Sequence, residues 1–314
     1  MSADRAVAHP TPLISRHPRR WAVLGPDWKL GYLLVLPVVA ILLAFIAIPF
    51  LTSIMLSFQD VRVGGDAVFV GFRNYGSLLV GANRARFYNS VGVSMLYTLT
   101  AVLAKFVLGM TMALVLHNAI RGRNVFRAIL FLPWSIPAVV SAYAWKWIYD
   151  DMRGVLNVQL SHHGLIKEPI LWTADIHLAL WAVVAAVVWQ GMPFWTMTFL
   201  AGLQAIPSEL YDAAHIDGAG ALQSFLYVTL PNMVTVIVVT ALLSTIWTAN
   251  GLQYIYILTA GGPANATETF PMLALTLGLR SYDIGMGATV PLLYFPLFAV
   301  LIYVLTRRML REQY

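Results

Sequence analysis

The chain has 314 residues, of which 59% are hydrophobic and only 11% are charged, and its formal net charge is +6. Soluble domains carry roughly 25% charged residues, so this composition excludes an ordinary soluble protein and indicates a membrane protein. The chain contains no cysteine, which excludes disulfides, thiolate nucleophiles and cysteine-ligated metal sites.

Apolar runs divide the chain into predicted membrane spans. The first 29 residues are polar and basic, and the run after them is longer than the apolar core of a signal peptide, which is about 7–15 residues. We therefore predict a cytoplasmic tail over 1–29, a six-helix transmembrane domain over 30–306 and a cytoplasmic tail over 307–314. Each span needs about 20 mostly apolar residues, and the six runs are about Leu30–Phe58, Val91–Leu116, Ala128–Trp147, Ile176–Leu203, Asn232–Leu258 and Met286–Thr306. Prolines interrupt several of them, which predicts kinked helices in a packed bundle.

The distribution of Lys and Arg predicts the orientation of these spans. With the N-terminus inside, the inner segments hold 11 of the 20 basic residues and the outer loops hold 8, while Lys105 lies within the second span. Basic residues favour the cytoplasmic side, so we predict an all-α protein with both termini inside. The basic composition then reflects membrane orientation, and nothing in the sequence supports nucleic-acid binding.

The predicted inner loop over 204–231 departs from this charge pattern. It contains three acids, Glu209, Asp212 and Asp217, and no Lys or Arg. Pro207 is typical of a helix start, and Asp217-Gly218 is a turn signal. We predict a short helix, a turn, and a second short helix from Ala219, with Pro231 opening the fifth span. Such a loop either links two spans only, or offers a carboxylate to a basic partner.

The loop sequence ELYDAAHIDGAGALQSFLYVTLP resembles the EAA loop of ABC-transporter permeases. Asp212 stands where that family usually has glutamate, and the matching positions are Ala213, Ala214, Asp217, Gly218, Ala219, Leu230 and Pro231. Further segments resemble the carbohydrate-importer permeases of the maltose and glycerol-phosphate type, and they are FVGFRNY, FRAILFLPWSIP, GLQAIP and LTAGGPANATET. Within that family the chain looks most similar to the permeases of mycobacterial trehalose importers.

This resemblance implies a type I ABC importer in the bacterial cell membrane. A second permease subunit, two ATPase subunits and an extracytoplasmic sugar-binding protein would be the partners, and the cargo would be a sugar, for example the disaccharide trehalose. The chain lacks a phosphate-binding loop pattern, so ATP and magnesium are expected only in the partner ATPases, and no catalytic residue, metal site or cofactor is expected here. The coupling residues would be Glu209, Asp212, Ala213, Ala214, Asp217, Gly218 and Ala219.

Polar residues inside spans indicate a route for the cargo. Ser244, Thr248 and Gly251 have helical spacing, and by resemblance to the maltose permease this segment lines the sugar site. The predicted pathway residues are Gln190, Gly191, Ser244, Thr248, Asn250, Gly251, Gln253 and Tyr254, with Trp195 and Thr198 as neighbours. The alternative is that these small and polar residues only join helices. Lys105 would either pair with an acid or carbonyl, or belong to the pathway.

Other assignments stay open at this level. A secondary transporter acting without an ATPase would favour an internal repeat and charged core sites, which the sequence does not show clearly. A membrane enzyme would need positioned carboxylates or histidines, which the spans lack. The outer loops Asp150–Asp175 and Gly261–Asp283 either contact the binding protein or are plain solvated connections.

Overall fold

The computed structural model describes residues 28–62, 64–118 and 121–311, and these residues are mostly helical. Most of the predicted tail over 1–29, and the end of the tail over 307–314, lie outside the described residues. The chain divides into one unit ending at Thr52 and a second unit from Ser53 onward.

The first predicted span forms an unbroken helical run, Lys29–Ser57. It consists of α1 (Trp28–Leu42), the π-helical turn η1 (Leu43–Ala47) and α2 (Ile48–Ser57). The widened turn directly precedes Pro49, which has no N–H to donate and whose ring would crowd the carbonyl four residues earlier. The run confirms the expectation of one long apolar helix at this position.

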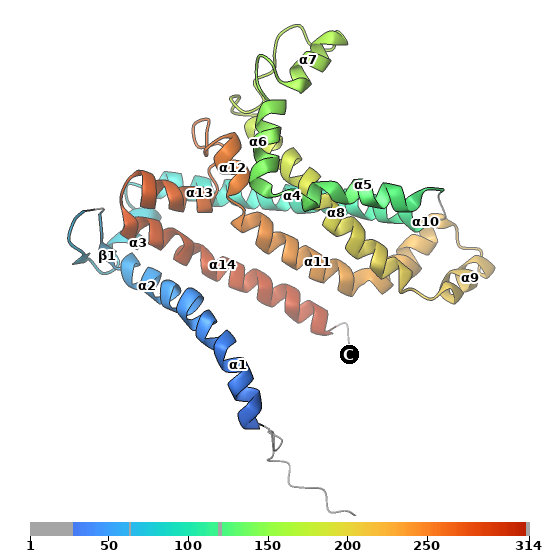
Figure 1. Ribbon diagram of the computed structural model, residues 1–314, viewed down its shortest axis with the longest axis horizontal. Helices are drawn as coiled ribbons and strands as arrows, with labels where there is room; N and C mark the ends of the chain where they lie inside the picture. Colours follow the sequence, from blue (N-terminus) through green and yellow to red (C-terminus); the bar gives the residue numbers. More distant parts are fainter. Residues whose placement is uncertain (1–27, 63, 119–120, 312–314) are drawn as a thin grey trace, which may run out of the picture. The chain divides into compact units, whose positions relative to one another are not determined.

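The second unit begins with the last turn of α2, followed by a small hairpin and a helical bundle (Figure 1). Strands β1 (Gln59–Asp60) and β2 (Val68–Phe69) pair antiparallel, and the short helix α3 (Arg73–Leu79) follows. The bundle consists of α4 (Arg84–His117), α8 (Ala179–Gln204), α11 (Leu230–Asn250) and α14 (Ile284–Arg311), with α11 packed against the other three. Helix α9 (Ser208–Ile216) lies at one end of this bundle, and α3 and β1 lie at the other (Figure 1).

The third predicted span is not a single helix. It is divided into α5 (Arg123–Ser135) and α6 (Ala138–Ile148), whose axes differ by 95°. Ile136 is extended, with ψ 130°, because the ring of the following Pro137 disfavours helical geometry there. Helix α6 therefore turns away from the bundle and leads to α7 (Val155–His162) beyond it (Figure 1).

The fifth span begins earlier than predicted. Helix α10 (Ala221–Ser224), the π-helical turn η2 (Phe225–Thr229) and α11 form one continuous run. The prediction that Pro231 opens this span is therefore wrong. Proline has no backbone N–H to donate, and the wider π-helical turn before Pro231 allows the helix to continue through it. After a break at Gly251 the chain forms α12 (Gln253–Leu258), α13 (Phe270–Leu275) and the π-helical turn η3 (Thr276–Arg280).

Within the described residues, four helices are long and apolar enough to cross a membrane, and a fifth is added if the bent pair counts as one span. The shorter apolar stretches are Phe270–Arg280 and Ile284–Val300. The all-helical membrane fold is confirmed, while the count of six spans and the inward orientation of both termini remain predictions.

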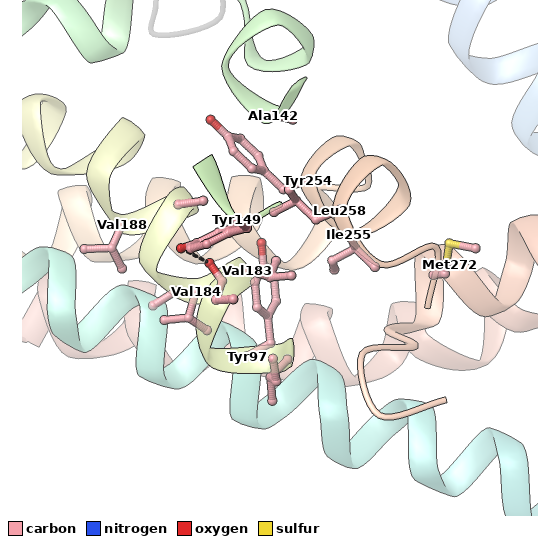
Figure 2. Close-up of a cluster of buried hydrophobic side chains, with 14 residues drawn as sticks. Tyr97, Ala142, Tyr149, Val183, Val184, Val188, Tyr254, Ile255, Leu258 and Met272 are labelled. Atoms are coloured by element: carbon pink, nitrogen blue, oxygen red, sulfur yellow. Dashed lines mark hydrogen bonds between the residues drawn. The ribbon is translucent and has the colours of Figure 1, made fainter. Parts of the chain in front are cut away.

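Of the three apolar clusters among the described residues of the second unit, two join α4 to α8. The first, here called the Tyr97 cluster, joins α4, α6, α8, α12 and α13 through residues that include Tyr97, Val183, Tyr254 and Ile255 (Figure 2). The second, the Trp195 cluster, joins α4, α8 and α11 through Met110, Trp195, Phe199 and Met233, among others. In membranes close packing of this kind replaces the hydrophobic effect as the force between helices.

Candidate functional site

The acidic loop contains the predicted first helix and turn, while the second helix is not a separate short one but runs on into α11. Helix α9 begins after Pro207, which has an extended backbone, and carries Glu209 in its first turn, where an acid complements the helix dipole. Gly218 has a φ of +78°, and this left-handed conformation favours glycine over residues with a Cβ. The N–H of Ala219 donates to the carbonyl oxygen of Ala214 at 2.9 Å and closes the turn.

The second helix starts two residues later than expected, at Ala221. The N–H of Gly220 donates to Oε1 of Gln223 at 2.8 Å, which caps this helix start. The hydroxyls of Tyr211 and Thr229 lie 3.0 Å apart and join α9 to the π-helical turn η2. The loop therefore has a defined shape of its own.

The predicted coupling residues lie mainly on the surface of this loop. Ala214 and Ala219 are half-buried, while the other five are exposed: Glu209, Asp212, Ala213, Asp217 and Gly218. In the part of the chain that the structure describes, none of the three acids forms an ion pair. Ile216 is 86% exposed and Leu222 is 70% exposed, so apolar side chains accompany the free carboxylates.

A cavity of about 210 Å³ lies between α4, α5, α6, α8, α11 and α12. Its lining includes seven of the eight predicted pathway residues: Gln190, Gly191, Ser244, Thr248, Gly251, Gln253 and Tyr254. Asn250 does not line it, because this side chain is exposed and its Nδ2 donates to the carbonyl of Ile246 at 2.8 Å. The bend at Ile136–Pro137 lies between the lining residues Trp134 and Ala138, and Gly251, where α11 ends, is itself part of the lining.

Most polar side chains of the cavity also join helices. Trp195 Nε1 donates to Ser244 Oγ at 3.0 Å, and Tyr254 donates to Ser141 Oγ at 2.6 Å. Gln190 Nε2 donates to the carbonyl of Ile136 at 3.1 Å, a group that the bend leaves without a helical partner. The two interpretations of these residues, pathway lining and helix joining, are thus not exclusive. Gln253 is exposed, and its side chain has no hydrogen bond among the described residues.

Sequence reasoning missed the aromatic part of the lining. Trp134, Phe194 and Trp247 come from three helices, and their ring centroids lie 5.2 to 5.9 Å apart. Tyr97 also lines the cavity. Trp195, a predicted neighbour, is instead buried in the Trp195 cluster at 1% exposure, and Thr198 bonds to the carbonyl of Phe194 on its own helix. Aromatic residues are common in apolar spans, so their type alone could not single out the lining ones.

Lys105 is the charged residue of this lining. It is 5% exposed, and its Nζ donates to Thr248 Oγ1 at 2.9 Å. The sequence left open whether this lysine belongs to the pathway or to a buried pair. It lies among the predicted pathway residues that line the cavity, and it also joins α4 to α11.

Comparisons with known proteins identify the family. A family model described as "Binding-protein-dependent transport system inner membrane component" matches residues 105–311. The trehalose/maltose transport system permease protein MalF of Thermococcus litoralis is 37% identical over 270 residues, which cover 86% of this chain and 90% of that protein. The trehalose transport system permease protein SugA of Mycobacterium tuberculosis is 30% identical over 278 residues, covering 88% and 87%. The expected similarity to trehalose-importer permeases is confirmed, although MalF shares more identity with this chain than SugA does.

A solved structure shows the same fold. It is a bacterial ABC transporter involved in the import of the acidic polysaccharide alginate, and the match has a TM-score of 0.78 at 21% identity, covering 91% of this chain and 96% of that one. The family consists of transport components, so the expectation of a non-enzymatic membrane subunit is confirmed. The chain therefore belongs to the family of binding-protein-dependent transport system inner membrane components, the multi-pass permease subunits of ABC importers.

Proposed function

We propose that this permease forms half of the translocation pathway of an ATP-driven importer for a sugar, with a disaccharide such as trehalose as the cargo. The observation that carries this proposal is the cavity, in which polar side chains from α8, α11 and α12 face a group of aromatic rings. Sugars present hydroxyl groups together with apolar ring faces, and ligand sites combine a few placed polar groups with aromatic walls. Relatives named for trehalose and maltose transport support the choice of cargo.

We also propose that the loop around α9 couples this subunit to an ATPase partner. Its exposed acids and apolar side chains form a shaped surface without a partner in the described chain. A cleft with basic and apolar groups on the ATPase would complement it. ATP and Mg²⁺ would then be bound by the partner ATPase subunits. The loop would lie on the cytoplasmic side, with both chain termini.

The remaining partners follow from the same proposal. A second permease would complete the pathway, and an extracytoplasmic binding protein would deliver the sugar. A related solved transporter, with a TM-score of 0.76 at 21% identity, is in complex with an alginate pentasaccharide-bound periplasmic protein. Helix α7 and the segment between α12 and α13 are the surfaces we propose for this contact, because both lie away from the end of the bundle that carries α9 (Figure 1).

Reconstitution tests the proposed function. The permease is purified with its ATPase and second permease, placed in liposomes, and supplied with the binding protein and radiolabelled trehalose. We expect uptake that requires ATP and the binding protein. Uptake by this chain alone, driven by an ion gradient without ATP, would instead support a secondary transporter.

A further inference from the structure

Lys105 is a buried cation without a balancing anion in the described chain. It lies within α4 and is 5% exposed. The ion pairs among the described residues are Arg62–Asp60, Arg73–Asp60 and Arg86–Glu268, and none of them involves Lys105. The cavity lining contains no acid. A charged side chain inside a membrane is costly and marks a functional position unless it is paired.

The hydrogen bonds of the ammonium group are also incomplete. A lysine ammonium has three N–H donors, and Thr248 Oγ1, at 2.9 Å, is the one acceptor it has among the described residues. Since the side chain lines the cavity, the other donors are available to a molecule that enters. A hydrogen bond from a charged donor is stronger than one between neutral groups.

The backbone opposite is adapted to this side chain. A Cβ built on Gly191 of α8 would lie 2.7 Å from Cε, 3.0 Å from Cδ and 3.1 Å from Nζ of Lys105. Any other residue at 191 would therefore occupy the space of the lysine. The glycine leaves the lysine stem enough room to cross from α4 to Thr248 on α11.

We propose that Lys105 contacts the cargo, donating charge-assisted hydrogen bonds to oxygen atoms of the transported saccharide, and that Gly191 is a positioning residue for it. This inference rests on the proposed function as a sugar permease. It changes the role of Gly191, which the sequence placed in the pathway as a lining residue. A purely structural Lys105 would instead only join α4 to α11 through Thr248.

The test measures uptake kinetics of the whole importer complex in liposomes, with trehalose and maltose as neutral probes and a uronic-acid disaccharide as the acidic probe. Lys105→Met keeps an unbranched side chain, one atom shorter than that of lysine, and removes the charge and the donors. We expect it to raise KM about ten- to hundredfold, the effect of losing hydrogen bonds from a charged group, with a smaller change in Vmax. A larger rise in KM for the acidic probe than for the neutral ones would show that Lys105 donates to a carboxylate of the saccharide. An equal rise in KM would show that it donates to a hydroxyl.

The second variant, Gly191→Ala, separates the positioning role from a general packing defect. We expect Gly191→Ala to raise KM as well, because the added methyl group displaces the lysine. The double variant, Lys105→Met with Gly191→Ala, should then have a KM no higher than that of Lys105→Met alone. Gly92→Ala on α4 is the matched control, since a Cβ there would meet nothing within 4 Å. Its KM should equal that of the wild type.

Three results would overturn the inference. They are an unchanged KM in Lys105→Met, a Gly191→Ala effect that persists in full beside Lys105→Met, and loss of complex assembly in Lys105→Met when subunits are co-purified. The last result would assign the lysine to a subunit contact. Normal wild-type import with an unchanged variant KM refutes this inference alone, whereas a wild-type complex that imports no saccharide refutes the proposed function as well.

Discussion

The guanidinium of Arg86 and the carboxylate of Glu268 form a two-point ion pair, with Nε 2.7 Å from Oε2 and Nη2 2.6 Å from Oε1. This ion pair joins the start of α4 to the segment between α12 and α13. Its two residues are 182 positions apart in the sequence. The Oγ of Ser94 accepts the N–H of Phe270 at 2.8 Å beside it. This segment is therefore anchored to α4 by side-chain contacts.

Removing the carboxylate of this pair is expected to destabilise the permease. The side chain of Glu268 is 2% exposed and that of Arg86 is 30% exposed. Breaking a buried pair costs about 3–5 kcal/mol, and the partial exposure of the arginine favours the lower end. We expect Glu268→Ala to lower the thermal unfolding midpoint of the purified complex markedly, and Arg86→Met with Glu268→Met to recover part of the loss. A midpoint equal to that of the wild type in Glu268→Ala would show that the pair contributes nothing to stability.

The coupling proposal predicts a separation of assembly from transport. Asp212→Ala removes an exposed carboxylate, so the fold of the loop should remain. We expect it to abolish sugar uptake and sugar-stimulated ATP hydrolysis while the subunits still co-purify. Glu312→Ala also removes one carboxylate, at a position far from Asp212 in the sequence, and serves as the control. It should leave sugar uptake and sugar-stimulated ATP hydrolysis unchanged. Normal sugar-stimulated ATP hydrolysis in Asp212→Ala would exclude a coupling role for this residue.

Gly218→Val tests the shape of the same loop. Nothing lies within 4 Å of a Cβ added to Gly218, but its φ of +78° strains any residue with a side chain. The left-handed conformation costs roughly 1–2 kcal/mol for an L-residue, and a β-branched side chain tolerates it least. We therefore expect a distorted turn and lost uptake in an assembled complex. Gly218→Asn, which accepts this conformation more readily, should retain more uptake than Gly218→Val.

The cavity predicts different effects at two adjacent positions. Gly251 lines the cavity at the break between α11 and α12, whereas Asn250 faces away from it. We expect Gly251→Leu to impair sugar uptake strongly, because its side chain would fill part of a space of about 210 Å³. Asn250→Leu should impair uptake less. Equal losses, measured as initial uptake rates in assembled complexes, would contradict this placement of the cavity.

Ser244 is expected to affect stability as well as transport. Its Oγ accepts the hydrogen bond of Trp195 Nε1 at 3.0 Å, and the tryptophan is 1% exposed. Ser244→Ala leaves a buried donor without a partner, which costs about 1–3 kcal/mol. Ser244→Thr retains the oxygen and should unfold at a temperature closer to that of the wild type. Identical thermal midpoints for both variants would show that this bond is not needed for stability.

Local sequence patterns were sufficient to predict where several helices and turns lie along the chain. Apolar runs predicted the helices around Leu30–Phe58 and Val91–Leu116, because a span needs a continuous apolar surface. Pro207 and Asp217-Gly218 predicted the start of α9 and its turn, because those residue types restrict the backbone directly. The loop sequence from Glu209 to Pro231 also indicated the family, through its resemblance to the EAA loop. Local patterns did not predict the sharp bend at Ile136–Pro137, since proline inside membrane helices gives anything from a mild kink to a break.

The sequence by itself determined that this is an all-helical membrane protein with an acidic helix–turn–helix, because hydrophobicity, turn residues and charge act over neighbouring positions. Its identity as a permease came from the resemblance of that loop to a known family. The tertiary structure decided which side chains share one cavity. Lys105, Gly191 and Thr248 belong to three helices, and their meeting depends on how those helices are rotated against one another. The same packing turns Asn250 away while its neighbour Gly251 faces inward. Helix rotation is set by many small packing contacts between distant segments, and no single stretch of sequence contains it.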